Sequence, residues 1–307
     1  MRTTEFLAAA TFLALVAAVY TAAGAVVIRA LAVRLRGRPA PLPRWRRWMR
    51  RGVLAAAGAG LVCMAYAFAI EPGWVEVTHV ALPTGKVPPG RPIRVVHISD
   101  LHCEGRPRLE RSLPDLIAAE RPDAIIFTGD AMNTPAGVPV FRELMARLAA
   151  LAPTYAVSGN WDAAGDPAAL YEGTGVMFLD GRRATLAVGP ARLRLIGVPM
   201  ARPADPGVER SEAFTIVLHH IGDLARGMDL SGVDLFCAGH THGGQIALPL
   251  WGPLVTLTRH GDGRGRVELG GTTLYVNRGI GMEGGPAPRV RFGARPEVTV
   301  YHIGPEQ

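Results

Sequence analysis

Short polar motifs in this chain carry residue types that bind metal ions. The stretch HISDLHCEGRPR at 97–108 holds Asp100 and His102 in an Asp-x-His spacing. Four further motifs follow along the chain: Gly129-Asp130, Gly159-Asn160-Trp161-Asp162, His219-His220 and GHTHGGQ at 239–245. Carboxylate, amide and imidazole ligands without Cys suit Mn, Fe, Zn or Co, and argue against a structural zinc site. Each motif alone is typical of an ordinary turn or a surface pair, but the set favours a metal centre.

The same stretch suggests a second chemistry, a thiolate phosphatase built on Cys103 and Arg108. Phosphatase loops of that kind place one residue more between the Cys and the Arg than the four that separate these two. Asp100 would also place a negative charge near the sulfur and raise the pKa of the thiol. We therefore expect Cys103 to be a packing residue and the metal to do the chemistry.

The metal-ligand motifs follow segments with the pattern of buried strands. The expected strands are 93–99, 124–128, 154–158, 193–198, 216–218, 235–238, 273–276 and 297–303. Helical spacing of apolar residues occurs at 109–120 and 140–151. This alternation predicts an α/β fold with sheets inside and helices outside. Loops beyond the carboxyl ends of strands are where such folds place their sites, so five of these strand ends are expected to meet.

The order of the motifs resembles the calcineurin-like metallophosphoesterases. GHTHGGQ and the tail LYVNRGIGMEGGPAPRVRFGARPEVTVYHI resemble the membrane-associated bacterial branch of that family. The resemblance covers roughly residues 92–305. It implies a four-layer β-sandwich flanked by helices, an α/β (α+β) fold with two divalent metal ions at one edge.

The resemblance also implies the ligands. One ion would be held by Asp100, His102, Asp130 and His242, and the other by Asp130, Asn160, His220 and His240. Asp130 would bridge the ions, and Asp130, Asn160 and His240 are the expected catalytic residues. His220 is preferred to His219 because the family's ligand His is often followed by two residues and an Asp, as in His220-Ile221-Gly222-Asp223.

The chemistry that this arrangement implies is hydrolysis of a phosphate mono- or diester. Two divalent ions ~3.5–4 Å apart lower the pKa of a bridging water, which attacks phosphorus as hydroxide. The same ions neutralise charge on the phosphoryl oxygens. The sequence therefore predicts a binuclear-metal phosphoesterase that uses metal-bridged hydroxide.

Trp161 departs from the family's usual Gly-Asn-His-Asp/Glu motif. Trp offers an indole N–H but no exchangeable proton at neutral pH, so three interpretations remain open. Trp161 lines a pocket for an apolar or nucleobase-bearing substrate, or the enzyme is slow, or the domain binds metal and phosphate without turnover. Trp161, Arg278 and His219 are the expected substrate-binding residues.

The N-terminal region has the composition of a membrane module. Residues 6–28 and 52–70 carry no charge, and nine Arg lie between the two runs. Uncharged runs of this length span a bilayer as helices, and an Arg-dense loop remains in the cytoplasm. We expect a two-span module at 1–71, a short strand and linker at 72–91, and an extracytoplasmic phosphoesterase domain at 92–307. A cleaved signal peptide is disfavoured by the poorly charged start of the chain.

The charge distribution argues against a nucleic-acid partner as the explanation of the pI of about 9.9. Residues 1–71 hold ten Arg and two acids, which leaves 23 basic and 24 acidic residues in 72–307. The expected partners are the lipid bilayer and a phosphate ester, an envelope lipid or a lipid-linked phosphate. The alternatives are a pyrophosphatase of UDP-diacylglucosamine at the cytoplasmic face and a metal- and phosphate-binding module.

Overall fold

The computed structural model describes residues 3–37, 41–162, 165–201, 203–209, 211–283 and 288–305. The chain divides into two compact units, residues 1–70 and 71–307. In the first unit, helices α1 (Thr3–Arg36) and α2 (Arg44–Ala69) pack against each other. The Tyr20 hydroxyl of α1 donates a hydrogen bond to the Ala57 carbonyl of α2 (3.2 Å). Both helices are long and apolar enough to cross a membrane.

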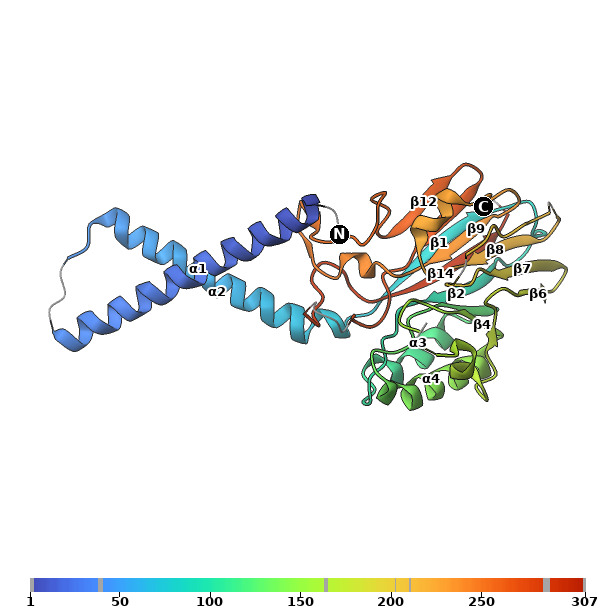
Figure 1. Ribbon diagram of the computed structural model, residues 1–307, viewed down its shortest axis with the longest axis horizontal. Coiled ribbons are helices and arrows are strands. Elements are labelled where there is room, and N and C mark those ends of the chain that lie inside the picture. Colours follow the sequence, from blue (N-terminus) through green and yellow to red (C-terminus); the bar gives the residue numbers. More distant parts are fainter. Residues whose placement is uncertain are drawn as a thin grey trace. The chain divides into compact units, whose positions relative to one another are not determined.

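The second unit contains two six-stranded sheets (Figure 1). The first sheet has the order β1 (Glu76–Pro83), β14 (Glu297–Gly304), β2 (Ile93–Ile98), β3 (Ala124–Thr128), β4 (Thr154–Val157) and β5 (Met177–Phe178). The second has the order β12 (Gly265–Leu269), β13 (Thr272–Val276), β9 (Leu235–Ala238), β8 (Phe214–Leu218), β7 (Ala191–Gly197) and β6 (Arg183–Val188). Strands β2 to β5 run parallel, as do β7, β8, β9 and β13.

The side chains of the strands form the core in layers. One face of β2, β3 and β4 packs against the second sheet and contributes Val95, Ile126 and Val157 to the shared core. The opposite face is covered by α3 (Leu113–Ala119) and α4 (Val138–Leu151), which lie together on that side of the sheet in Figure 1. The outer face of the second sheet is covered by the short 3-10 helix η5 (Gly222–Gly227) and neighbouring loops.

This architecture confirms the expected sandwich, with differences at the edges. The predicted helix 109–120 is divided into the 3-10 turn η2 (Leu109–Arg111) and α3, because Pro114 in the first turn of α3 has no backbone N–H to continue a helix from η2. Residues 76–83 of the expected linker region form β1 and pair in parallel with β14. The edge strands β6 and β12 were not predicted, because their residues alternate between partly buried and exposed and do not form a long apolar run.

The loops that carry the polar motifs all leave carboxyl ends of parallel strands. Strand β2 leads to Asp100, β3 to Asp130, β4 to Asn160, β8 to His220 and β9 to His240. Because the first three strands are neighbours in one sheet and the last two in the other, the loops meet at one edge of the sandwich.

Candidate metal centre

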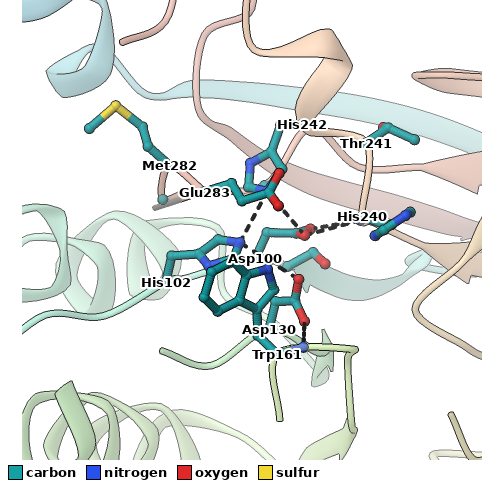
Figure 2. Close-up of polar contacts among 12 residues, drawn as sticks. Asp100, His102, Asp130, Trp161, His240, Thr241, His242, Met282 and Glu283 are labelled. Carbon is teal, nitrogen blue, oxygen red and sulfur yellow. Dashed lines mark hydrogen bonds and ion pairs between the residues drawn. The ribbon is translucent and has the colours of Figure 1, made fainter. Parts of the chain in front are cut away.

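Two clusters of metal-binding side chains form at this edge (Figure 2). The ligand atoms of Asp100, His102 and His242 all lie within 4.8 Å of one another, as do those of Asp130, His220 and His240. All of these side chains are buried except that of His240, which is partly exposed. Six of the seven predicted ligands therefore fall into two groups of one carboxylate and two imidazoles.

Asp130 lies between the clusters. Its Oδ2 atom is 3.2 Å from Nε2 of His220 in its own cluster and 3.6 Å from Nε2 of His102 in the other. Its Oδ1 accepts the backbone N–H of Trp161 (2.9 Å). One oxygen of Asp130 is thus within reach of ligands on both sides, as a bridging carboxylate requires.

Asn160, the seventh predicted ligand, lies beside the second cluster. Its Oδ1 is 3.0 Å from Nε2 of His220, and Nδ1 of the same ring lies 2.7 Å from the Thr128 carbonyl. A carbonyl accepts only, so Nδ1 of His220 carries the proton and Nε2 faces Asp130 and Asn160. A hydrogen bond of this kind is the usual way a protein fixes the tautomer and direction of a metal-ligating His.

The donor set fits divalent ions. Nε2 of His102 and Nε2 of His242 lie only 3.1 Å apart, and Nδ1 of His102 is buried without a hydrogen-bond partner among the described residues. Burial lowers the pKa values of His102 and His240 to about 4, and it lowers the pKa of His242 well below its ordinary value. These rings are therefore neutral at pH 7, the form that binds a metal.

Of the three remaining titratable ligands, His220 and Asp130 hold opposite charges. Burial opposes the charged form of His220, but the Asp130 carboxylate outweighs burial and raises the pKa of His220 to about 9. Burial likewise acts against the Asp130 carboxylate, and the charge of His220 nevertheless lowers its pKa. Burial raises the pKa of Asp100 to about 7. A divalent cation would take over the role of the proton on His220.

The backbone at the site is strained. Five of the predicted ligands have positive φ angles, in the left-handed region that residues with a side chain rarely adopt: Asp100, His102, Asp130, His240 and His242. Such conformations cost about 1–3 kcal/mol each and persist only where surrounding contacts impose them. The concentration of strain at these five positions is typical of a functional site.

Asp162 supports the site and was not among the predicted site residues. Its buried carboxylate accepts the backbone N–H groups of Asp130 (2.8 Å), Ala131 (2.9 Å) and Gly159 (2.8 Å). Burial, followed by the charge of Asp130, raises the pKa of Asp162 to about 6. Asp162 joins the loops after β3 and β4. Its place in the Gly-Asn-x-Asp motif is the sequence feature from which this role could have been predicted.

Arg291 is a second residue that the sequence did not single out. Its guanidinium is completely buried and donates to the carbonyls of Gly279, Gly281 and Ala294, among others. Its Nη2 atom also lies 3.3 Å from Nδ1 of His242. Arg291 therefore holds the loop after β13 against the first cluster.

Trp161 borders the first cluster in place of the family's usual His. Its ring meets that of His102 edge to face, with centroids 5.6 Å apart (Figure 2). Its side chain also hydrogen-bonds to Glu283, whose pKa is raised by burial and then by the charge of Asp130. Glu283 has no counterpart among the predicted residues, and it places a carboxyl group beside the indole.

The two other predicted substrate-binding residues have protein partners. Arg278 Nε lies 3.1 Å from Glu297 and its Nη2 lies 2.8 Å from Glu76. His219 is buried, and its Nδ1 accepts the backbone N–H of Ile221 (2.9 Å). Nε2 of His219 has no hydrogen-bond partner among the described residues. Substrate binding by Arg278 and His219 stays a prediction.

Cys103 packs in the core below the site. Its side chain is completely buried against the α3 and α4 side of the first sheet. Burial, with a further contribution from Glu110, raises the pKa of the thiol well above its ordinary value. A protonated, inaccessible thiol is a poor nucleophile, so the thiolate mechanism is excluded.

Comparison with known proteins decides the family. Residues 93–244 match the model of the calcineurin-like phosphoesterases. The metallophosphoesterase YkuE of Bacillus subtilis, itself uncharacterized, is 30% identical over 285 residues, which cover 84% of this chain and 97% of that protein. The chain belongs to the calcineurin-like phosphoesterase family. It is accordingly a phosphoesterase, a hydrolase of phosphate esters, and its two clusters form a candidate dinuclear site for divalent ions.

Two further proteins are similar to this chain over most of its length. The phosphodiesterase YaeI of Escherichia coli is 27% identical over 272 residues, covering 83% of this chain and 98% of that protein. A dimetal phosphatase from Danio rerio matches over 70% of this chain and 94% of its own, with 13% identity and a TM-score of 0.42.

Proposed function

We propose that this protein is a membrane-anchored, two-metal phosphoesterase. One ion would be held by Asp100, His102, Asp130 and His242, and the other by Asp130, Asn160, His220 and His240. The observation that carries the proposal is the position of Asp130, within 4 Å of one imidazole from each cluster. When bound, a pair of divalent ions supplies Lewis-acid activation of water and neutralises phosphoryl charge.

The protein's own residues contribute positioning. Thr128 fixes the tautomer of His220 through its carbonyl, and Asp162 fixes the backbone of Asp130. Asn160 presents its side-chain oxygen beside His220. Trp161 and Glu283 flank the clusters, where they would exclude water and contact the ester. Manganese is the ion that we would test first.

The proposed substrate is a phosphate ester of an envelope lipid or a lipid-linked sugar. Two apolar helices precede the domain, and a domain tethered to a bilayer meets lipid phosphates at high local concentration. The Arg-rich segment between the helices favours an extracytoplasmic domain. The likeness to a phosphodiesterase of Escherichia coli supports a diester rather than a monoester.

Metal content and hydrolysis, measured on the full chain in detergent, test the two-metal site. We expect about two ions per chain and Mn-dependent cleavage of bis-p-nitrophenyl phosphate, faster than that of p-nitrophenyl phosphate. Asp130→Asn should abolish both properties, while Cys103→Ser should retain them. Chelation by EDTA should stop the reaction, and Mn should restore it. Metal binding without turnover of either ester or of lipid phosphates would favour the binding-module alternative that Trp161 suggests.

A C-terminal reporter tests the orientation. Alkaline phosphatase fused after residue 307 is active only outside the cytoplasm, whereas a fluorescent protein folds inside. If the domain is extracytoplasmic, we expect the alkaline phosphatase fusion to be active and the fluorescent-protein fusion to be dark. The reverse result would place the domain at the cytoplasmic face, where a UDP-diacylglucosamine pyrophosphatase would act.

A further inference from the structure

A short hairpin beside the metal loops presents apolar side chains to solvent. Strands β10 (Ala247–Leu248) and β11 (Gly252–Pro253) pair antiparallel and leave Leu250 and Trp251 at the tip. Leu250 is fully exposed, with a positive φ angle, and Trp251 is 76% exposed. Two adjacent large apolar residues at a projecting tip are uncommon on a protein surface that faces only water. They indicate that the tip contacts another apolar surface.

The base of the hairpin is fixed to the site. The hairpin directly follows the loop that carries His240 and His242. The Gln245 carbonyl accepts the N–H of Phe292 (3.0 Å), and the N–H of Ala247 donates to the Phe292 carbonyl (2.6 Å). The backbone pairing with Phe292 therefore holds the base of the hairpin directly after the loop that carries His240 and His242.

The segment that follows Phe292 also contacts the first residue of the domain unit, Glu71. The buried carboxylate of Glu71 accepts the backbone N–H groups of Gly293 (3.0 Å) and Ala294 (2.6 Å), the residues that follow Phe292. The second candidate membrane span runs from Arg44 to Gly73, so Glu71 belongs to its last turn. The chain thus enters the domain at the segment on which the hairpin rests.

Residues around this point have the composition of a membrane interface. Trp74 is half exposed and follows the candidate span directly. The Arg295 guanidinium lies over the Trp74 ring, 4.2 Å from its centroid. The exposed Arg264 donates to the Gly293 carbonyl (3.0 Å). Trp at a span end and Arg beside it suit the headgroup zone, where anionic lipids attract basic side chains.

We propose that Leu250 and Trp251 insert into the bilayer that the two helices cross, with Trp74, Arg264 and Arg295 at the headgroup level. This inference rests on the membrane anchoring of the proposed function. It places the loop of His240 and His242 next to the headgroups. The substrate class that this position favours is a phosphate ester still embedded in the bilayer, rather than one diffusing in solution.

Spin labels measure the insertion directly. The full chain with Cys63→Ser is reconstituted in nanodiscs of phosphatidylethanolamine and phosphatidylglycerol, and single labels are placed at Leu250→Cys or Thr185→Cys. Cys103 and Cys237 are buried, and Thr185 lies exposed on β6 at the far edge of the second sheet. We expect the label at 250 to be more accessible to oxygen than to a nickel chelate, and the label at 185 to show the reverse. Equal aqueous accessibility at both positions would overturn the proposal.

Kinetics give a second readout. The double variant Leu250→Ser/Trp251→Ser should raise KM for an acyl-chain p-nitrophenyl phosphodiester in nanodiscs about tenfold, since two apolar side chains lose their burial. Its rate on soluble bis-p-nitrophenyl phosphate should not change, which also shows that it folds. An unchanged KM for the embedded ester counts against the proposal. If the unmodified protein hydrolyses neither ester, the proposed function fails, and the spin-label accessibilities still decide the insertion.

Discussion

Gly159 and Asp130 approach so closely that no side chain fits between them. A Cβ atom built on Gly159 would lie 2.2 Å from Oδ1 of Asp130 and 2.4 Å from its backbone nitrogen. Both distances are far below van der Waals contact, so the absence of a side chain at 159 allows the loops after β3 and β4 to meet. Asp130 then reaches both clusters.

Gly159→Ala should therefore displace Asp130 and disrupt the metal centre. We expect at least a tenfold loss of metal affinity, measured by titration of the metal-free protein, together with loss of esterase activity. The matched control is Gly271→Ala, because a Cβ atom at Gly271 meets open space. Full metal affinity in Gly159→Ala would show that the loops are free to separate without affecting Asp130.

Asp162→Asn tests whether the hydrogen bonds accepted by Asp162 hold Asp130 in position. The carboxylate accepts three backbone N–H groups, whereas an amide presents one oxygen and an NH₂ group that cannot accept. Loss of a residue that orients a metal ligand typically costs 10–100-fold in metal affinity or activity, and we expect a loss in that range. Asp115→Asn, at an exposed position on α3, should leave both quantities unchanged. Equal metal affinities of the two variants would argue against a positioning role.

Trp161→His restores the residue that the family usually has at this position. A general acid typically contributes 10²–10⁴-fold, and its benefit is largest for a poor leaving group. We expect kcat for phenyl or alkyl phosphate esters to rise about tenfold or more, with a smaller change for p-nitrophenyl esters. Trp161→Phe keeps an aromatic ring without a proton to donate and should show no such gain. A uniform fall in kcat for all esters in Trp161→His would indicate that the indole itself contacts the substrate.

The interaction of Glu297 with Arg278 should make the stability of the protein depend on pH. Burial acts to raise the pKa of Glu297, but the charge of Arg278 and the hydrogen bonds from Arg278 lower it on balance. A lowered carboxyl pKa contributes stability above the unfolded value of 4.5, and that contribution is lost as the pH falls through the folded value.

Glu297→Gln should destabilise the protein by about 3 kcal/mol near pH 7, because it leaves a partly buried cation with one carboxylate fewer. Denaturation in guanidinium chloride from pH 7 down to pH 3 should show the difference from the unmodified protein shrinking below about pH 4.5. Glu172→Gln, at an exposed position, serves as the control. A difference that stays constant with pH would mean that Glu297 acts through packing rather than charge.

The candidate metal ligands could be predicted from the sequence. Ligand residue types at the ends of apolar runs, with glycines beside them, are local features, and their order along the chain carried the family resemblance. The family resemblance, through the spacing of His220 to Asp223, favoured His220 over His219, and the structure places His220 beside Asp130 and Asn160. Local patterns further predicted two apolar helices and most of the buried parallel strands, because a strand buried on both faces is apolar throughout.

The contacts between these groups could not be derived from local sequence patterns. The family resemblance implied two ligand sets with Asp130 between them, but the contacts that form the two clusters depend on strand order, which places β2, β3 and β4 in one sheet and β8 and β9 in the other. The supports from Asp162 and Arg291 come from loops that are distant in sequence, and an acid or an Arg in such a loop has no periodic pattern that predicts its partner. Edge strands β6 and β12 likewise depend on pairing, each with the strand that follows it, β7 and β13, because their half-exposed residues form no long apolar run. Spacing along a chain records which residues are neighbours on one element, whereas a metal centre is built from contacts between elements.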